Sequence, residues 1–313
     1  MQISVLLSTY NGASYIREFL DSLLDQTYRN FTVLVRDDGS TDDTLLILKE
    51  YKSYFKERMH FLDAVEGNVG PAKSFSALMK ASDADYVLFA DQDDIWMPNK
   101  IQRLYDEMLQ QQRLNPGAPV LVQCDLEVVD KNLNRIAPSF WQFQGLDVSR
   151  NTLPNLVIQN TITGCAVMIN RKLVMQAGKV PDSAIMHDWW VGLVAAAFGR
   201  IVSVPETLIR YRQHGSNSVG AKKYGFSYFI ERISEMLSSR DLSLTRRSIE
   251  DSRLQAIAFL DRYGALLQTE DRIILEKFAT LPSMSWLARR YFLFKNGMTK
   301  HGVMRNFALF LFV

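Results

Sequence analysis

The sequence contains only two cysteines, Cys124 and Cys165, in 313 residues. Two thiols are too few for a disulfide framework, so we expect a protein of a reducing compartment. An excess of charge of one sign is also missing, because 36 lysines and arginines stand against 34 aspartates and glutamates. The resulting net charge of +2 gives no reason to expect a nucleic-acid partner, since proteins that bind nucleic acids usually carry a clear basic excess.

Long apolar runs are missing as well. No stretch reaches the roughly 20 apolar residues that a transmembrane helix needs. At the start, Met1 and Gln2 lead directly into the run Ile3–Leu7, which is typical of a core strand and not of a signal peptide. The glycine-rich signatures G-x-x-x-x-G-K-[ST] and G-x-G-x-x-G are absent, which argues against a P-loop NTPase and a dinucleotide-dependent dehydrogenase.

The first half of the chain alternates between short apolar runs and helical patterns. This alternation is typical of an α/β fold with a Rossmann-like, mostly parallel sheet flanked by helices. In such sheets ligands bind beyond the carboxyl ends of the strands. We expect strands at Ile3–Ser8, Phe31–Val35, Tyr86–Ala90 and Val120–Cys124, and helices at Ser14–Leu24, Asp42–Tyr54, Pro71–Ala81 and Pro98–Gln112.

The second half is less regular, and its last third is helical in pattern from Tyr224 onward. The length fits two domains of about 150 residues each. We therefore predict a domain 1–223, with halves of about 1–115 and 116–223, followed by a helical C-terminal region 224–313. Further strands are predicted at Thr163–Asn170, Arg200–Val204 and Glu206–Gln213, and a further helix at His187–Phe198.

Acidic residues follow two of the predicted strands. Asp37 and Asp38 come after one, and Asp91 and Asp93 come after another. Asp91 and Asp93 are two positions apart in an extended segment, so their side chains point the same way. Paired carboxylates repel each other unless a divalent cation lies near them, and hard oxygen ligands suit Mg²⁺ or Mn²⁺. Because Mg²⁺ held in this way keeps positions open for phosphate oxygens, a diphosphate is the expected ligand.

Four motifs in this order resemble those of inverting family-2 glycosyltransferases with a GT-A fold. They are Ser8–Gly12, Arg36–Asp42, Asp91–Asp94 and His187–Trp190. The resemblance covers about residues 1–220 and implies a GT-A catalytic domain. Its first half would bind a nucleotide sugar and its second half an acceptor. Within the family, the chain most resembles the bacterial rhamnosyltransferases that build cell-wall and capsular polysaccharides.

The resemblance also implies roles for single residues. Asp188 matches the catalytic base, although the residues alone leave open a carboxylate that only complements a helix dipole. A metal ion would be bound by Asp93, Asp91 and His214, although a lone histidine is more often structural. The implied donor-binding residues are Thr9, Tyr10, Asn11, Asp37, Asp38, Lys73, Asp91 and Arg212, and the implied acceptor-side residues are Thr163, Gly164, Trp189 and Trp190. We expect Cys165 to be a small buried residue and not a nucleophile.

The implied donor is dTDP-L-rhamnose, and the implied acceptor is a lipid-linked saccharide. The Q-x-x-R-W motif and flanking transmembrane helices of the family's processive synthases are absent, so we expect transfer of one or a few sugars. Three alternatives stay open: another donor such as a UDP-hexose, a nucleotidyltransferase, and a nucleotide-sugar-binding protein without catalysis. The nucleotidyltransferase is disfavoured because Ser8–Gly12 is not the glycine-rich signature that such enzymes usually carry.

The C-terminal segment from Leu281 to Val313 has no acidic residue. Its basic residues lie among aromatic ones, which is typical of an interfacial anchor on an anionic membrane. A helix packed on the catalytic domain or across a homodimer interface is the alternative. We therefore expect a cytoplasmic enzyme that associates peripherally with the inner face of the cytoplasmic membrane. The basic residues are Arg289, Arg290, Lys295, Lys300 and Arg305.

Overall fold

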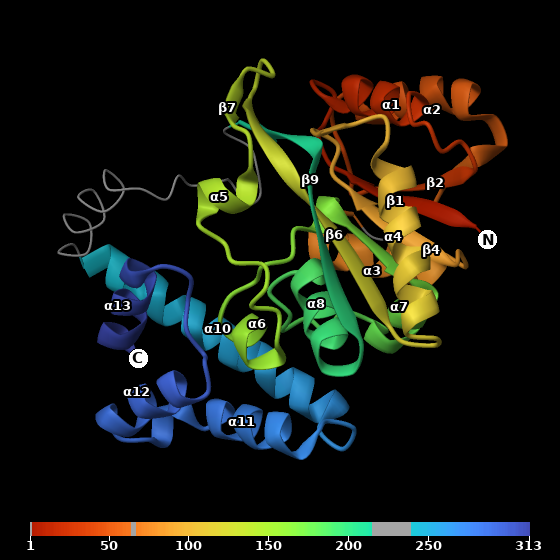
Figure 1. Ribbon diagram of the computed structural model, residues 1–313. Helices are drawn as coiled ribbons and strands as arrows, with labels where there is room; N and C mark the ends of the chain where they lie inside the picture. Colours follow the sequence, from red (N-terminus) through yellow and green to blue (C-terminus); the bar gives the residue numbers. More distant parts are fainter. Residues whose placement is uncertain (1, 64–66, 215–238) are drawn as a thin grey trace.

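The computed structural model describes residues 2–63, 67–214 and 239–313. It has an α/β fold in which helices cover both faces of one sheet, as the sequence predicts (Figure 1). The described residues contribute nine strands to this sheet: β1 (Ile3–Thr9), β2 (Phe31–Asp37), β3 (Met59–Phe61), β4 (Tyr86–Ala90), β5 (Ile95–Trp96), β6 (Val120–Asp130), β7 (Arg135–Ala137), β8 (Val167–Asn170) and β9 (Arg200–Gln213).

The strand order is β3-β2-β1-β4-β8-β6-β9-β5, and β7 pairs with β6. Strands β3, β2, β1 and β4 are parallel, and β6 is parallel to β9. Strand β8 lies between β4 and β6 and is antiparallel to both, so β4 and β6 point the same way. The carboxyl ends of β1, β2, β4, β6 and β9 therefore lie at the same end of the sheet, which confirms the mostly parallel arrangement.

Several strands differ from their predicted extents. Strands β3, β5 and β7 were not predicted, because two or three residues are too few to show a period. Strand β6 continues past Cys124 to Asp130. The prediction ended too early because Asp125 and Glu127 interrupt the apolar run, although both are buried. The two strands expected at Arg200–Val204 and Glu206–Gln213 form one strand, β9, whose pairing with β6 contains register shifts.

The helices of the first half lie where they are predicted, within a few residues at their ends. Helix α1 buries Ile16, Phe19, Leu20 and Leu23, the spacing of one helix face. Helix α3 begins with Pro71, whose missing N–H needs no partner there. The helices before residue 200 are α1 (Ile16–Leu24), α2 (Thr44–Phe55), α3 (Pro71–Ala81), α4 (Lys100–Leu114), α5 (Phe140–Gln144), α6 (Leu153–Ile158), α7 (Arg171–Ala177) and α8 (His187–Phe198), with 3₁₀ turns at Lys56–Arg58 and Gly164–Ala166.

Two hydrophobic clusters lie on opposite faces of the sheet. Helices α1, α2 and α4 cover one cluster, and α3, α6, α7 and α8 cover the other. Alternate residues of a strand point to opposite faces. Accordingly, Leu6 of β1 belongs to the α8 side, while Val5 and Leu7 belong to the α1 side.

The C-terminal helices pack on the α8 side of the sheet (Figure 1). Phe259 contacts Trp190 of α8 at 5.4 Å between ring centroids, and Arg150 donates to Thr299 Oγ1 at 2.7 Å. The C-terminal helices and the sheet thus share one core, and the boundary predicted at 223/224 lies outside the described residues. These helices are α10 (Ser239–Tyr263), α11 (Thr269–Ala279), α12 (Trp286–Lys295) and α13 (Val303–Phe312), with a 3₁₀ turn at Leu281–Ser283. Among the helices that the structure describes, none is both long enough and apolar enough to cross a membrane.

Candidate active site

The loop after β2 is organised by the side chain of Asp37. Its Oδ1 accepts hydrogen bonds from Thr9 Oγ1 at 2.8 Å and from Ser40 Oγ at 2.6 Å. Its Oδ2 accepts from the backbone N–H groups of Ser40 at 2.8 Å and Gly39 at 3.2 Å. These bonds join the loop to the end of β1 and fix its shape. A nucleotide contact by Asp37 would have to share lone pairs that the protein already uses.

The neighbouring Asp38 is turned toward the start of α3. Its carboxylate pairs with Arg36 and accepts from the backbone N–H groups of Val69 at 3.0 Å and Gly70 at 2.8 Å. Asp38 is only 3% exposed. The sequence left open which of the two aspartates faces the nucleotide. The structure gives Asp38 a role in fixing the start of α3, whereas Asp37 is bonded to the predicted nucleotide-binding segment.

Lys73 lies in the first turns of α3 on the surface. Its Nζ is 3.1 Å from Asp182 Oδ1, and the two side chains are 59% and 76% exposed. An exposed ion pair of this kind holds its partners weakly, because water screens and competes for both charges. Lys73 could therefore leave Asp182 for a diphosphate, and this contact stays a prediction.

Gln92, between the two aspartates of the D-x-D pair, binds the loop after β1. Its Oε1 accepts from the backbone N–H of Tyr10 at 3.0 Å, and its Nε2 donates to the Tyr10 carbonyl at 2.8 Å. A Cβ atom on Gly12 would lie 2.1 Å from Gln92 Oε1, so a larger residue there would displace the Gln92 amide from Tyr10. The Tyr10 side chain is 46% exposed, and Asn11 next to it adopts a positive φ of 46°. The role of Gln92 was not predicted from the sequence, because the D-x-D motif specifies only Asp91 and Asp93.

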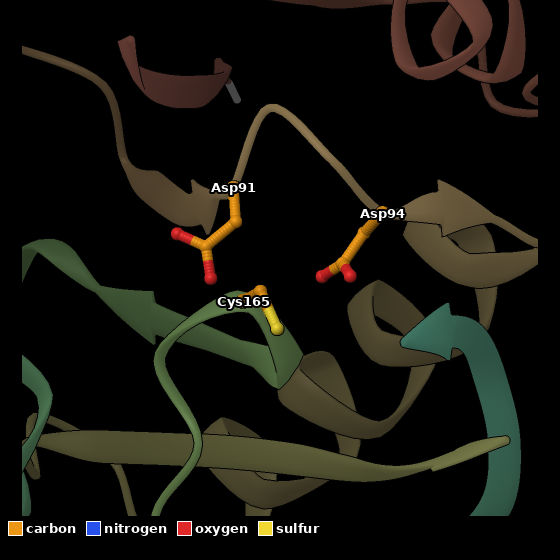
Figure 2. Close-up of side chains that lie close together, drawn as sticks. All are labelled: Asp91, Asp94 and Cys165. Atoms are coloured by element: carbon orange, nitrogen blue, oxygen red, sulfur yellow. The ribbon is translucent and has the colours of Figure 1, made fainter. Parts of the chain in front are cut away.

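Asp91 and Asp94 point toward Cys165 from the turn after β4 (Figure 2). One carboxylate oxygen of each aspartate and the Cys165 Sγ lie within 4.8 Å of one another, and we call these three residues the acidic cluster. Burial, together with the charges of Asp93 and Asp188, raises the pKa of Asp91 to about 7. Cys165 is 1% exposed, which confirms a buried residue, and burial raises the pKa of its thiol well above the usual value, which disfavours the nucleophilic thiolate.

A buried lysine, Lys100, lies next to the acidic cluster. Its Nζ donates to the Cys165 carbonyl at 2.7 Å and lies 3.1 Å from the centroid of the Trp96 ring. Burial lowers the pKa of Lys100 to about 8, while nearby acidic groups that include Asp94 and Asp91 oppose this shift. Lys100 thus keeps a positive charge at neutral pH beside Asp91 and Asp94, the pKa values of which burial raises. Lys100 was not predicted as a site residue, because a lysine in a helix is usually exposed.

The three predicted metal ligands do not come together at one point. Asp93 Oδ2 lies 2.8 Å from His214 Nε2, and the His214 ring stacks on Tyr15 at 4.6 Å between centroids. Asp91 is turned instead to the acidic cluster, which among the described residues is the group of three whose ligand atoms all lie close together. Asp93 and His214 thus form a pair, Asp91 belongs to the acidic cluster, and the metal site of all three residues stays a prediction.

Arg212 is buried at the end of β9. Its Nε donates to the Asp93 carbonyl at 2.9 Å, its Nη1 donates to the Lys131 carbonyl at 2.7 Å, and its Nη2 pairs with Glu18. The side chain is 2% exposed. Arg212 therefore ties β9 to the D-x-D turn and to α1. A contact with a donor diphosphate, as the sequence predicts, would have to replace one of these bonds.

Asp188 lies in the first turn of α8 beside Gly164. The backbone N–H of Trp189 donates to Asp188 Oδ1 at 2.7 Å. Burial raises the pKa of Asp188 to about 6, so the carboxylate is ionised at neutral pH and can accept a proton. A Cβ atom on Gly164 would lie 3.2 Å from His187 Nε2 and 3.5 Å from Asp188 Oδ2, so the Gly164 turn lies directly against both side chains. Thr163 lies directly before this turn and is partly buried.

The side chain of His187, directly before Asp188, is buried between aromatic rings. Its ring stacks on Phe75 at 4.1 Å and meets the Phe89 ring edge-on at 4.8 Å. Neither ring nitrogen has a hydrogen-bond partner within the described structure, and burial lowers the pKa of His187 to about 3. A neutral imidazole with unpartnered nitrogens beside a buried carboxylate indicates a place where a ligand or water would supply the missing bonds.

The two tryptophans after Asp188 lie in different surroundings. Trp189 is partly buried, and its Nε1 donates to the Leu156 carbonyl at 2.6 Å. Trp190 is 0% exposed, and its Nε1 donates to the Ala177 carbonyl at 3.1 Å. The prediction that Trp190 lies on the acceptor side is wrong, because consecutive helix residues point about 100° apart and Trp190 faces the core. Trp189 stays a prediction for that side.

Comparisons with known proteins agree with a glycosyltransferase site of this geometry. The sequence model for "Glycosyl transferase family 2" matches residues 4–174. The uncharacterized glycosyltransferase alr2836 of Nostoc sp. is 28% identical over 225 residues, which are 70% of this chain and 66% of that protein. The dTDP-rhamnosyl transferase RfbG of Shigella flexneri is 28% identical over 227 residues, which are 69% of this chain and 74% of that protein.

Solved structures show the same fold. TarS of Staphylococcus aureus in complex with UDP-GlcNAc superposes with a TM-score of 0.62 at 20% identity, over 93% of this chain and 73% of that chain. The mannosyltransferase PcManGT of Pyrobaculum calidifontis, in complex with GDP-Man and Mn²⁺, gives a TM-score of 0.51 at 16% identity, over 94% of this chain and 85% of that chain. These likenesses confirm the predicted GT-A fold. Since the family model covers more than half of the sequence, from β1 into α7, the chain belongs to glycosyltransferase family 2.

Proposed function

We propose that this family-2 glycosyltransferase works by metal-dependent inverting transfer. An acceptor hydroxyl attacks the anomeric carbon of a nucleotide sugar while Asp188 takes the hydroxyl proton. The new carbon–oxygen bond forms as the bond from the anomeric carbon to the diphosphate breaks, and the electron pair leaves with the diphosphate. A single displacement of this kind inverts the anomeric configuration. A positioned general base contributes about 10²–10⁴ to the rate.

The place of Asp188 is the observation that carries this proposal. Its carboxylate is buried, has a pKa raised to about 6, and lies near enough to Asp91 for its charge to raise the pKa of that residue. Such a group is ionised at neutral pH and still basic enough to take a proton in the transition state. Base and predicted donor site are therefore electrostatic neighbours. This pairing also argues against a nucleotide-sugar-binding protein without catalysis.

Asp93 and His214 fit a divalent cation chemically. A carboxylate oxygen and an imidazole nitrogen 2.8 Å apart are ligands that Mn²⁺ and, less readily, Mg²⁺ accept. Burial and mutual repulsion raise the pKa of Asp91 to about 7 and that of Asp94 well above its usual value, and a divalent cation near them would relieve this repulsion. A bound Mg²⁺ or Mn²⁺ would stabilise the charge that builds on the leaving diphosphate. The Mn²⁺ in the PcManGT complex supports this assignment.

For the donor we propose dTDP-L-rhamnose, and for the acceptor a lipid-linked saccharide of a bacterial surface polysaccharide. The name of RfbG, a dTDP-rhamnosyl transferase, supports the donor. The UDP-GlcNAc bound to TarS supports the alternative, a UDP-hexose. We place the reaction in the cytoplasm at the membrane surface, where a lipid-linked acceptor would lie. The proposed donor contacts are Thr9, Tyr10, Asn11, Asp37, Lys73 and Asp91, and the proposed acceptor-side contacts are Thr163, Gly164 and Trp189.

A panel of nucleotide sugars with and without Mn²⁺ tests this function. A donor at a hundred times its Kd stabilises the fold by about 2.7 kcal/mol, which thermal denaturation detects. We expect the largest shift with dTDP-L-rhamnose and only in the presence of metal. A larger shift with UDP-GlcNAc would replace rhamnose by a UDP-hexose. Binding without hydrolysis or transfer of any donor would contradict an enzyme, and retained anomeric configuration in the product, seen by NMR, would contradict inversion.

A further inference from the structure

Helix α12 exposes an apolar face of its own. The side chains of Leu287, Tyr291 and Phe294 are 71%, 66% and 74% exposed. Their spacing of four and three residues places them on one side of the helix. On another side, Phe292 and Leu293 are buried in the core shared with the sheet. The helix is thus apolar on the side that packs and also on the side that faces solvent.

Helix α13 repeats this arrangement. Val303, Phe307 and Leu311 are 81%, 57% and 48% exposed and follow one another at intervals of four residues. The two helices are neighbours, since Arg290 Nη2 donates to the Leu311 carbonyl at 3.2 Å. Leu311 and Trp286, which is 60% exposed, line one hollow of about 350 Å³ between the helices and α10. Helices α12 and α13 thus meet at this hollow, and we call the exposed apolar residues of the two helices the C-terminal patch.

The charge of the C-terminal patch has one sign. Residues 281–313 contain five basic and no acidic residues. The Arg290 guanidinium lies 3.5 Å from the centroid of the Trp286 ring, and the Lys295 ammonium lies 6.0 Å from that of Tyr291. Arg290 also donates to the backbone carbonyl of Trp286 at 2.7 Å. Cations thus lie beside exposed aromatic rings, whose faces attract them.

We propose that the C-terminal patch docks on an anionic lipid bilayer. Aromatic and aliphatic side chains among cations, without carboxylates, are the composition of segments that lie in a membrane interface. In such an interface the aromatic rings would lie at the level of the lipid headgroups, and the arginine and lysine side chains would contact anionic headgroups. This inference specifies the membrane surface of the proposed function and depends on that function only for its purpose, the approach to a lipid-linked acceptor.

Charge favours a bilayer over a second copy of the chain as the occupant. Two copies meeting through this patch would bring basic residues against basic residues, which costs free energy at an interface. Anionic headgroups instead contribute about 1 kcal/mol per lysine or arginine near the surface, or about fivefold in affinity. The acidic residue that lines the hollow, Glu250, is already paired with Arg253 at 2.6 Å. It therefore adds no free negative charge to attract a second basic patch.

Vesicle co-sedimentation of the full chain tests the proposal. The probes are phosphatidylcholine vesicles, with and without about one third phosphatidylglycerol. We expect binding to the anionic vesicles that weakens as salt is added. The double variant Leu287→Ser/Phe294→Ser should bind at least about tenfold more weakly, because two apolar side chains no longer leave water. Lys295→Glu should also weaken binding, and more on anionic than on neutral vesicles.

A matched control is Leu114→Ser at the end of α4, where the leucine is 67% exposed. This control should bind vesicles as the parent does. Equal binding by the double variant and the parent, or no binding of the parent to anionic vesicles, would overturn the proposal. A parent dimer that dissociates on Phe294→Ser in sedimentation velocity would assign the patch to a second copy and overturn it as well. Donor hydrolysis without vesicles should be unchanged in every variant. A parent that binds vesicles but transfers no sugar would contradict the proposed function and leave the membrane surface in place.

Discussion

The donor side and the base side of the candidate site are built in opposite ways. At the ends of β1 and β2, the carboxylates of Asp37 and Asp38 accept hydrogen bonds from the loops around them. Next to Asp188 in α8, both buried ring nitrogens of His187 lack hydrogen-bond partners within the described structure.

This difference indicates which part of the site is complete without ligand. Satisfied carboxylates stabilise a loop shape, and the shape is then ready to receive a nucleotide. A buried polar group without a partner costs about 1–3 kcal/mol, so a fold keeps one chiefly where a ligand or water supplies the bond. We therefore expect substitutions on the base side to change the chemical step, and substitutions on the donor side to change donor affinity.

The largest expected effect is on the base side. Asp188→Asn keeps the size of the side chain and an oxygen that can accept from Trp189, but removes the proton-accepting charge. We expect kcat to fall by about 10²-fold or more while the donor Kd stays near the parent value. The parent rate should fall as the pH falls through about 6, because the carboxylate whose pKa is raised to that value becomes protonated. The variant should lack this acidic limb.

The matched control for this variant is Asp83→Asn, since the Asp83 side chain is 97% exposed and lies outside the site. It should transfer sugar as the parent does and keep the acidic limb. Transfer by Asp188→Asn at near the parent rate would mean that another group is the base. The contrast between the two sides of the site would then lose its main support.

The next largest effect is expected at Asp93 and His214, the pair that we propose binds the metal. Asp93→Ala removes the carboxylate that lies 2.8 Å from His214, and we expect metal-dependent donor affinity to fall by about a hundredfold. Calorimetry with donor, with and without Mn²⁺, measures this loss. His214→Ala should act in the same direction, and Asp83→Ala should leave affinity unchanged. Parent-like affinity in Asp93→Ala would remove the metal assignment, whatever the activity of the variant.

A smaller effect is expected below the D-x-D turn. Lys100→Met keeps an unbranched apolar stem but removes the donor to the Cys165 carbonyl and the charge beside Asp91 and Asp94. We expect donor affinity at neutral pH to fall by about tenfold, because the charge-assisted bond that joins the start of α4 to the 3₁₀ turn at Cys165 is lost. Calorimetry reports the affinity, and a thermal melt separates it from loss of fold. Unchanged affinity would confine Lys100 to a packing role.

Much of the donor side could be predicted from the sequence, because its residues follow strands directly. Asp37, Asp91 and Asp93 were placed at one end of the sheet from the strand pattern alone, and the structure puts them there. Strand ends are local features that a short apolar run followed by polar residues reveals. The bonding of Asp37 to Thr9 was not predictable, since it joins loops that are distant in the sequence.

The base side was harder to predict because helix α8 is apolar on nearly all sides. Its pattern gave no reason to send Trp189 and Trp190 to different places, and only the packing of Trp190 on Phe259 decides this. Lys100 was missed for the opposite reason, since its charge suggested an exposed residue. Both errors arise where tertiary packing overrides what a residue does on average.

The smallest expected effect concerns Lys73, and it tests whether this residue of the donor side binds the donor diphosphate. Lys73 and Asp182 form an exposed pair, so neither Lys73→Met nor Asp182→Asn should change the melting temperature. If Lys73 binds the diphosphate, Lys73→Met should weaken the donor by a few fold, while Asp182→Asn should bind as tightly as the parent or slightly tighter, because the ammonium is released. The two variants break the same ion pair, and only one removes the cation. Equal donor affinity in both would mean that Lys73 is a surface residue, and that the donor side is completed by its bonded loops alone.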